Sequence, residues 1–387
     1  RSSDLCNIIH LLKAESGDCV LLQLANKRCI LIDCGYKSTY EYELKPLLLR
    51  LSSEDYVISL LIITHYDEDH IGGAISFLKD NGDNLNPNII QIEEIWFNGI
   101  FNLIKHSTIL QKHVVEKLSS KNEEKYGKVF EQFLGLIGSG AGLISANLAQ
   151  TFELLCEENH YNLNSINDGR PIVEGVRLKQ GEYSIRCLNP NQKLLLNLES
   201  WINKVCIDSL GPNYELKKKD FLTFLQNMLL SMGREAISDI PVSQIGVSPI
   251  DIDSWIGTSS LAPMNDVNRA SIVVEMSYKG RKFLFMADSE SSDWIKVASN
   301  KYDFVKISHH GTTKPNIALL ENIKFNKAFI STNGRRNHPE DEFLARLIKS
   351  DVSELYFNYD IRRKAILSNL ELTYKYKTYF GKSKIYF

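Results

Sequence analysis

The sequence predicts an α/β protein in which apolar strands deliver polar residues at their carboxyl ends. The apolar run Val57–Ile63 is typical of a buried strand, and Ala74–Lys79 has a helical pattern. Between them, His65–His70 holds two imidazoles and three carboxylates. Polar residues follow several later apolar runs in the same way. Because α/β proteins bind ligands where a strand runs into a helix, this layout predicts a site as well as a fold class.

Composition and charge narrow the functional classes. The 387 residues allow one large domain with insertions or two ordinary domains. A net charge of −2 gives no overall basic field, which weakens a nuclease hypothesis but leaves room for a local basic groove. The seven cysteines contain no CxxC pair and indicate reduced thiols in a cytosolic protein. Apolar runs are only of strand length, so we expect a cytoplasmic protein without a membrane partner.

The remaining elements are expected to form a β-rich scaffold that two mainly helical segments interrupt. Helical periodicity runs through most of Phe101–Asp168 and again through Asn191–Pro263. A helix is expected at Tyr40–Leu51, with an irregular start because of Pro46. The expected strands are Leu5–Leu12, Cys19–Leu24, Arg28–Ile32, Ile89–Phe97, Gly181–Pro190, Asn268–Met276, Lys282–Met286, Phe304–Ile307 and Ala328–Ser331.

The charged stretch His65–His70 is costly at the mouth of an apolar strand unless something compensates its charge. A divalent metal ion would do so, since imidazole nitrogens and carboxylate oxygens are its ligands. The alternative is a solvated helix start, where Asp67 or Asp69 is favoured by the helix dipole. Five of the nine histidines fall in three short clusters soon after strands, which favours the metal site. The clusters are His65 with His70, His309 with His310, and His338. One further carboxylate, that of Asp288, also follows a strand.

The segment HYDEDHIGG resembles the HxHxDH signature of the metallo-β-lactamase superfamily, with Asp67 where the second His is usual. That HxDxDH variant is similar to the hydrolase domain of ComEC-type DNA-uptake proteins. The resemblance implies a single four-layer αβ/βα sandwich over residues 1–387, with helical insertions at residues 101–168 and 191–263. Nothing of the ComEC membrane channel is found in this sequence.

The resemblance also implies two divalent metal ions, manganese or zinc, and a role for each ligand. His65 and Asp67 look like ligands of the first ion, Asp69 and His70 of the second, and Asp288 like the bridging carboxylate. His309 matches the last ligand best, and His310 is a close rival. Asp33, in an Asp-x-Gly turn, is expected to orient ligands rather than to bind metal.

One motif of the superfamily is missing. No His lies between His160 and Asp288, where the third motif normally supplies one. ComEC-type sequences carry an Asn-x-x-Ser there, which matches Asn268 and Ser271, and we expect these two residues and Arg269 to contact substrate. The first site is then oxygen-rich and one ligand short, which favours Mn²⁺ over a zinc pair.

His338 is the remaining catalytic candidate besides Asp69. A similar His-Pro in ComEC-type sequences suggests that it contacts a substrate oxygen or donates a proton. A helix-start residue before Pro339 is the alternative.

Three functions follow from these features. The leading hypothesis is a metal-dependent phosphodiesterase that acts as a nuclease, with a nucleic acid or nucleotide as substrate. The second is a hydrolase of a small phosphodiester, such as a cyclic nucleotide or a phosphocholine ester, which the near-neutral charge favours. The third is a regulatory subunit, for instance of a phage-defence system, that has a degenerate metal site and binds a protein partner through the insertions.

Overall fold

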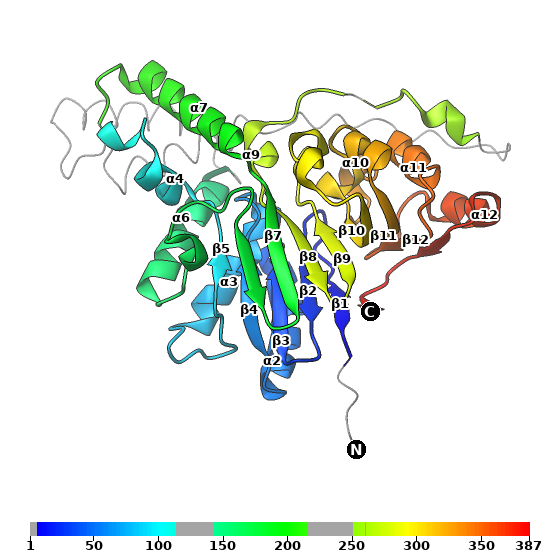
Figure 1. Ribbon diagram of the computed structural model, residues 1–387, viewed down its shortest axis with the longest axis horizontal. Coiled ribbons are helices and arrows are strands. Elements are labelled where there is room, and N and C mark those ends of the chain that lie inside the picture. Colours follow the sequence, from blue (N-terminus) through cyan, green and yellow to red (C-terminus); the bar gives the residue numbers. More distant parts are fainter. Residues whose placement is uncertain (1–5, 114–141, 216–250, 260) are drawn as a thin grey trace.

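Two β-sheets face each other in the middle of the molecule, and helices cover the outer side of each (Figure 1). The structure, a computed structural model, describes residues 6–113, 142–215, 251–259 and 261–387. The first sheet has the order β14 (Lys384–Tyr386), β1 (Ile8–Leu11), β2 (Val20–Gln23), β3 (Arg28–Ile32), β4 (Val57–Ile62) and β5 (Ile95–Trp96). The second has the order β13 (Lys377–Tyr379), β12 (Glu354–Phe357), β11 (Lys324–Ile330), β10 (Lys301–Lys306), β9 (Arg281–Phe285), β8 (Val273–Tyr278), β7 (Tyr183–Asn189) and β6 (Arg177–Gln180).

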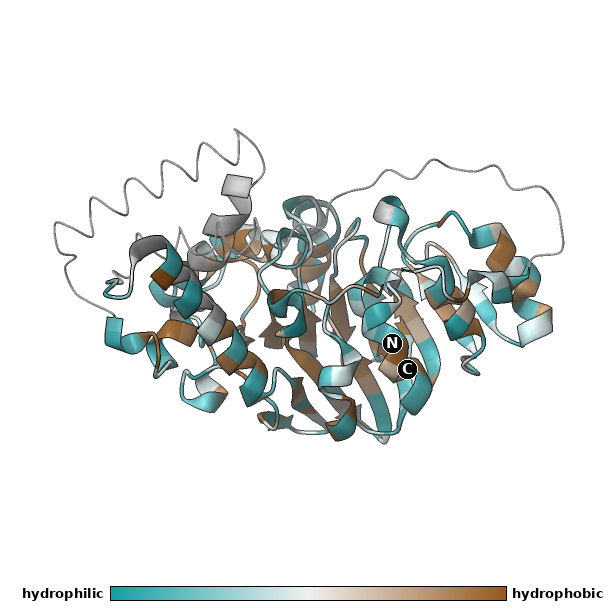
Figure 2. Cartoon of the chain, turned by 90° about the horizontal axis from the view of Figure 1, so that it is seen from above, coloured by the Kyte–Doolittle hydropathy of each residue, from teal (hydrophilic) through white to brown (hydrophobic). Residues whose placement is uncertain are grey.

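Three apolar cores hold four layers together. The central core lies between the sheets, where Leu60 and Ile62 of β4 join Phe285 of β9. Two outer cores lie on the far sides of the sheets. One packs the first sheet against its helices, and the other packs the second sheet against its helices. Figure 2 shows the apolar strands inside and polar residues on the helices outside. This arrangement confirms the predicted mixed α/β sandwich and is consistent with a metallo-β-lactamase fold.

The helices of the outer layers are short and mostly amphipathic. Those on the first sheet are α1 (Lys37–Thr39), a π-helical turn at Tyr40–Leu44, α2 (Lys45–Ser53), α3 (Glu68–Asn81), α4 (Ile100–His106) and α6 (Gly142–Glu158). Those on the second sheet are α10 (Ile317–Asn322), α11 (Asp341–Ile348) and α12 (Lys364–Tyr374). The irregular start expected at Pro46 is the π-helical turn, which passes into α2 one residue earlier.

Parallel pairing brings the carboxyl ends of several strands to one edge of the sandwich. Strand β4 is parallel to β3, while β9, β10, β11 and β12 run parallel to one another. The segments that follow β4, β9 and β10 contain the predicted ligands. Strand direction therefore gathers residues that are more than 200 positions apart in the chain.

Three sequence predictions about local structure were wrong. Helix α3 begins at Glu68, so that Asp69 and His70 lie in its first turn rather than in a loop. This helix requires glycine at position 73, because a Cβ there would lie 2.1 Å from the carbonyl oxygen of Cys34. Asn268 lies in the short helix α9 (Asp266–Arg269) rather than in a strand, and the strand expected at Ile89–Phe97 is reduced to β5.

The described parts of the two insertions are helical. The first contains α4, a 3-10 turn at Gln111–His113, α6 and a 3-10 turn at Ser165–Asn167; the second contains α7 (Gln192–Leu210) and a 3-10 turn at Ile252–Trp255. Residues 114–141 and 216–250 lie outside the described residues. The insertions touch where the Ser107 hydroxyl donates to Glu199 of α7 at 2.7 Å. Among the described helices, none combines the length and the apolarity that a membrane span requires.

Candidate metal centre

Four imidazoles surround one carboxylate oxygen at this edge of the sandwich. The Oδ2 of Asp288, just after β9, lies 3.5 Å from Nε2 of His70 and 3.6 Å from Nε2 of His310. It lies 3.9 Å from Nε2 of His65 and of His309. Asp288 is thus a common neighbour of all four imidazoles.

The first half of the cluster combines the segment from the end of β4 to the first turn of α3 with Asp288. Nε2 of His65 lies 3.6 Å from Oδ2 of Asp67, and the rings of His65 and His70 have centroids 4.1 Å apart. His65, His70 and Asp288 offer ligand atoms within 4.8 Å of one another. A cation between them would have the imidazole and carboxylate donors that divalent metals take.

The second half combines the first turn of α3 with the segment after β10. Nε2 of His310 lies 3.7 Å from Oδ2 of Asp69, and Nε2 of His70 lies 3.9 Å from Oδ1 of Asp69. These three residues form a second group of possible ligands. The His310 side chain is 5% exposed, against 21% for His309, and its Nδ1 bonds the Ser331 carbonyl at 2.9 Å. Sequence reasoning preferred His309; the geometry favours His310.

Asp33 fixes the orientation of both histidines of the β4–α3 segment. Its carboxylate accepts hydrogen bonds from the Thr64 amide and hydroxyl, each at 2.8 Å, and lies 2.8 Å from Nδ1 of His70. The Thr64 hydroxyl is also 3.1 Å from Nδ1 of His65. With Nδ1 engaged, each ring turns its Nε2 toward the cluster, as outer partners of metal-bound histidines do.

Several buried polar atoms of the cluster have no hydrogen-bond partner among the described residues. They are Nε2 of His65, Nε2 of His70 and Oδ1 of Asp288. Such orphaned atoms cost about 1–3 kcal/mol each, so a fold keeps them only when something else satisfies them. Imidazole nitrogens and carboxylate oxygens aimed at common points fit divalent cations.

The pKa values of the cluster show that its carboxylates and imidazoles compete for protons. Burial raises the pKa of Asp69 to about 6. Burial alone would lower the pKa of His70, but the carboxylates of Asp288, Asp33 and Asp69 raise it well above its usual value. Burial works against ionisation of Asp288 too, yet His310, His70 and His309 hold its pKa well below the usual range. The cluster thus favours cationic partners for its carboxylates.

Sequence reasoning missed two residues beneath the ligands, Asp18 and Lys306. Both are buried, and their side chains form an ion pair. Asp18 also joins Asp33 and His70 in a third group of possible ligands. The signal was present in the sequence, because Lys306 is a charged residue inside the apolar run Phe304–Ile307.

The cluster holds more carboxylates than fixed cations. It contains one ammonium group, that of Lys306, and the carboxylates of Asp18, Asp33, Asp67, Asp69 and Asp288. Burial of this excess negative charge is unfavourable unless protons or bound cations compensate it.

The predicted substrate contacts have mixed outcomes. Arg269 donates to Asp293 through two nitrogens, at 2.9 and 2.6 Å, so its guanidinium is engaged within the fold rather than available to a phosphate. Oδ1 of Asn268 and Oγ of Ser271 are buried and have no hydrogen-bond partner among the described residues. The amide of Ile272 donates to the Thr64 carbonyl at 2.9 Å, which places this segment beside His65.

His338 lies on the opposite side of the cluster, next to the segment after β10. Its ring centroid is 5.9 Å from that of His309 and 6.2 Å from that of His310. The amide of Glu340 donates to the Gly311 carbonyl at 3.0 Å, which ties the two loops together. His338 is only partly buried.

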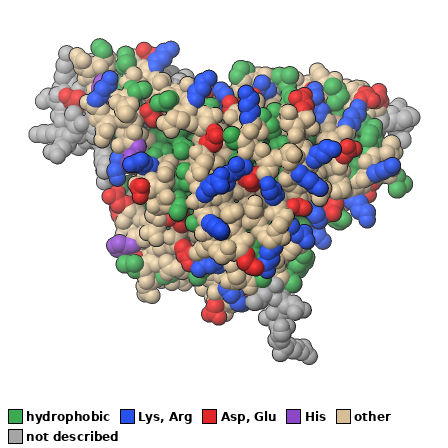
Figure 3. Space-filling view, in the orientation of Figure 1, with side chains coloured by type: hydrophobic (Ala, Val, Ile, Leu, Met, Phe, Trp, Pro, Cys, Tyr) green, Lys and Arg blue, Asp and Glu red, His purple; other side chains and the backbone are tan. Residues whose placement is uncertain are grey.

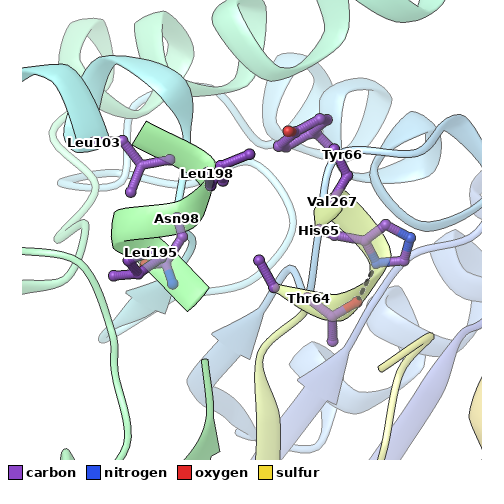
Figure 4. A pocket seen from close by; sticks show the side chains of 9 residues that line it. Thr64, His65, Tyr66, Asn98, Leu103, Leu195, Leu198 and Val267 are labelled. Atoms are coloured by element: carbon purple, nitrogen blue, oxygen red, sulfur yellow. Dashed lines mark hydrogen bonds between the residues drawn. The ribbon is translucent and has the colours of Figure 1, made fainter. Parts of the chain in front are cut away.

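A narrow, mostly apolar pocket adjoins His65. Figure 4 shows Leu195 and Leu198 of α7 and Leu103 of α4 on one side of the pocket, and Thr64, His65 and Tyr66 on the other. Both insertions therefore reach the neighbourhood of the first ligand. The lining residues are Thr64, His65, Tyr66, Asn98, Leu103, Leu195, Leu198, Val267 and Ala270.

Residues 12–85 match the family model of the metallo-beta-lactamase superfamily. The match covers Asp33 and the whole Thr64–His70 segment, so the candidate metal centre lies partly within the part of the chain that is similar to this superfamily. No curated protein matches the chain. Two solved structures resemble it at 10% sequence identity. One is the metallo-beta-lactamase fold protein YhfI from Bacillus subtilis, with a TM-score of 0.36 and 99% of each chain covered. The other is a mutant of the CmlA beta-hydroxylase, with a TM-score of 0.37 and coverage of 98% of this chain and 53% of that chain.

Proposed function

We propose that the chain is a phosphodiesterase that depends on two divalent metal ions and acts as a nuclease. The observation that carries this proposal is the Oδ2 of Asp288, which lies within 3.9 Å of Nε2 of four histidines, two of which also approach Asp69. One ion would be held by His65, Asp67 and Asp288, and the other by Asp69, His70, His310 and Asp288.

Two such ions would supply a water whose pKa is lowered toward neutrality, together with positive charge for the oxygens of a phosphodiester. The protein residues do the rest. Asp33 and Thr64 hold His65 and His70 in register, as described above. His338 faces the cluster from the solvent side, where its imidazole can give a proton to the departing oxygen.

Manganese suits the first site better than zinc does. Asp67 replaces a histidine there, and the two unpartnered oxygens of Asn268 and Ser271 lie on the segment beside His65. Oxygen-rich sites favour Mn²⁺, whereas zinc prefers nitrogen and sulfur ligands. Asp67 also gives the sequence its likeness to ComEC-type hydrolase domains, and we include that likeness in the proposal.

A second candidate function is hydrolysis of a small phosphodiester. The net charge of −2 favours it, because a nucleic-acid substrate calls for a more basic protein. Figure 3 shows lysines and arginines interspersed with acidic residues on the face toward the viewer, without a continuous basic stripe over its described part. A nuclease would bind DNA or RNA along a more basic path than that face offers.

The test is hydrolysis of bis(p-nitrophenyl) phosphate with added Mn²⁺ by the wild type and by Asp69→Asn. Loss of this ligand should lower the rate by more than about 100-fold, since even outer partners of a metal site cost 10- to 100-fold. Asp83→Asn, at an exposed acid just after α3, is the matched control and should keep full activity.

Substrate panels then separate the candidates. Cleavage of single-stranded DNA, RNA or plasmid would support the nuclease, and cleavage of cyclic nucleotides alone would support the small-substrate enzyme. A protein that holds its metal ions but hydrolyses no phosphodiester would contradict both. The helical insertions would then be examined as a surface for a protein partner.

A further inference from the structure

Lys306 is a buried lysine that no step proposed above uses. It is the last residue of β10, is 3% exposed, and forms an ion pair with Asp18, which is 2% exposed. Its ammonium nitrogen also lies 3.4 Å from the carbonyl oxygen of Ala287. Buried ion pairs add little stability on average, because desolvation offsets their attraction. A role beyond stability therefore has to come from what the pair connects.

Asp18 belongs to a segment that supports the turn holding Asp69. Its amide donates to the Asp69 carbonyl at 3.1 Å. The preceding residue, Gly17, lies so close that a Cβ there would be 2.0 Å from the same carbonyl oxygen. The Ser331 hydroxyl, after β11, donates to the Gly17 carbonyl at 2.6 Å. The segment is therefore wedged between α3 and the second sheet.

The other partner of Lys306 lies next to the bridging ligand. Ala287 immediately precedes Asp288 and has a φ of +49°, a conformation that residues with a side chain adopt only under constraint. Its carbonyl also accepts the amide of His309 at 3.1 Å. Lys306 thus joins the segment under Asp69, from the first sheet, to the turn that carries Asp288, from the second.

Asp18 does not orient the histidines by hydrogen bonds of its own. Its Oδ1 is 3.8 Å from Nδ1 of His310, and its Oδ2 is 3.9 Å from Nδ1 of His70. Those nitrogens are already engaged by Ser331 and Asp33. Asp18 and Lys306 therefore act on the centre through the two segments that they tie together.

We propose that Lys306 is a positioning residue that, through Asp18 and Ala287, clasps the ligand segments of the two sheets at the separation the metal pair requires. This inference rests on the proposed function in taking the cluster as a two-metal centre. The ammonium group of Lys306 also lies beside Asp18, which with Asp33 and His70 forms the third group of possible ligands. Since that ammonium already compensates Asp18, we expect these three residues to orient the centre rather than to bind a third ion.

The test measures Mn²⁺ affinity by calorimetry, and coupling between the two ions by electron paramagnetic resonance, in Lys306→Met. This change removes the charge and keeps the aliphatic stem. We expect affinity to fall by about 10- to 100-fold and the signal of a coupled pair to give way to that of isolated ions. Removing the ammonium leaves one more uncompensated carboxylate, which alone would strengthen cation binding. A fall therefore reports lost positioning rather than lost charge.

Two further variants complete the design. Asp18→Asn with Lys306→Met keeps the net charge of the wild type, leaves no unpaired buried ion, and carries the test if the single variant does not fold. It should also show weakened affinity. Lys327→Gln, on the neighbouring strand β11, breaks an ion pair of 3.1 Å with Glu354 and should bind Mn²⁺ like the wild type.

The outcomes separate this inference from the proposed function. Unchanged or increased affinity in Lys306→Met, or wild-type affinity in the double variant, would overturn the clasp while the phosphodiesterase proposal stands. A wild-type protein that binds no Mn²⁺ would overturn both. A wild type that binds two ions and hydrolyses no phosphodiester would overturn the proposed function alone.

Discussion

The carboxylate of Asp33 lies 2.8 Å from Nδ1 of His70, although 37 residues separate them in the chain. The same carboxylate accepts two hydrogen bonds from Thr64, the residue before His65. Asp33 itself has a φ of +55°, so the backbone after β3 is bent to bring its side chain there. One side chain thereby orients two proposed ligands, His70 directly and His65 through Thr64.

Asp33→Asn should weaken metal binding without removing any proposed ligand. An amide cannot accept all three hydrogen bonds, so His70 loses its fixed orientation, and we expect Mn²⁺ affinity to fall by about 10- to 100-fold. Asp303→Asn is the control, since Asp303 accepts a hydrogen bond from the Lys282 amide at 2.8 Å on β10. Calorimetric titration with Mn²⁺ checks this; an affinity within about twofold of the wild type would show that Asp33 orients nothing essential.

The two adjacent histidines after β10 should differ in their contributions. His310→Ala removes a buried ring whose Nε2 lies within 3.7 Å of both Asp69 and Asp288, and we expect it to release one metal ion per chain. His309→Ala removes a more exposed ring and should leave the metal content near that of the wild type. Elemental analysis after dialysis makes the comparison. The reverse order of effects would restore His309 as the ligand.

Strand-end residues were predictable from sequence because their positions follow from strand direction alone. The runs Val57–Ile63, Lys282–Met286 and Phe304–Ile307 are apolar enough to be recognised as strands, and strand direction then places the residues that follow them at one edge. Strand direction alone therefore predicts that Asp288 and the histidine clusters lie near one another.

Contacts across the two sheets were not predictable in the same way. Nothing in local sequence shows that Lys306 meets Asp18, because 288 positions separate them and the packing of two sheets decides the contact. The ion pair of Arg269 with Asp293 was not predictable either, because it depends on how the segment before β8 packs against the loop after β9. The start of α3 was misplaced because Gly72 and Gly73 are poor helix formers, and tertiary packing overrides that preference.

Metal binding should strengthen as the pH rises through about 6. Burial raises the pKa of Asp69 to about 6, so below that value the ligand is protonated and must lose its proton to bind an ion. His70, whose pKa its carboxylate neighbours raise against the effect of burial, releases a proton as well. The rise in melting temperature caused by Mn²⁺ should therefore be larger at pH 7.5 than at pH 5.5. An equal rise at both values would contradict this coupling.

His338→Ala should keep both metal ions and lose rate in a way that depends on the leaving group. If the imidazole protonates the departing oxygen, the loss is about 10²- to 10⁴-fold for a phenyl phosphodiester of a nucleotide, whose leaving group is poor. It is much smaller for bis(p-nitrophenyl) phosphate, whose leaving group needs little help. His160→Ala, at an exposed histidine of the first insertion, is the control. Equal losses with both substrates would exclude a proton-donor role.

Anomalous X-ray diffraction from crystals grown with Mn²⁺ tests the two-metal centre most directly. We expect two peaks per chain, one between His65, Asp67 and Asp288 and the other between Asp69, His70, His310 and Asp288. Peaks that share no ligand, or crystals with no peak at Asp288, would contradict a two-metal centre and remove the chemical basis of the proposed phosphodiesterase.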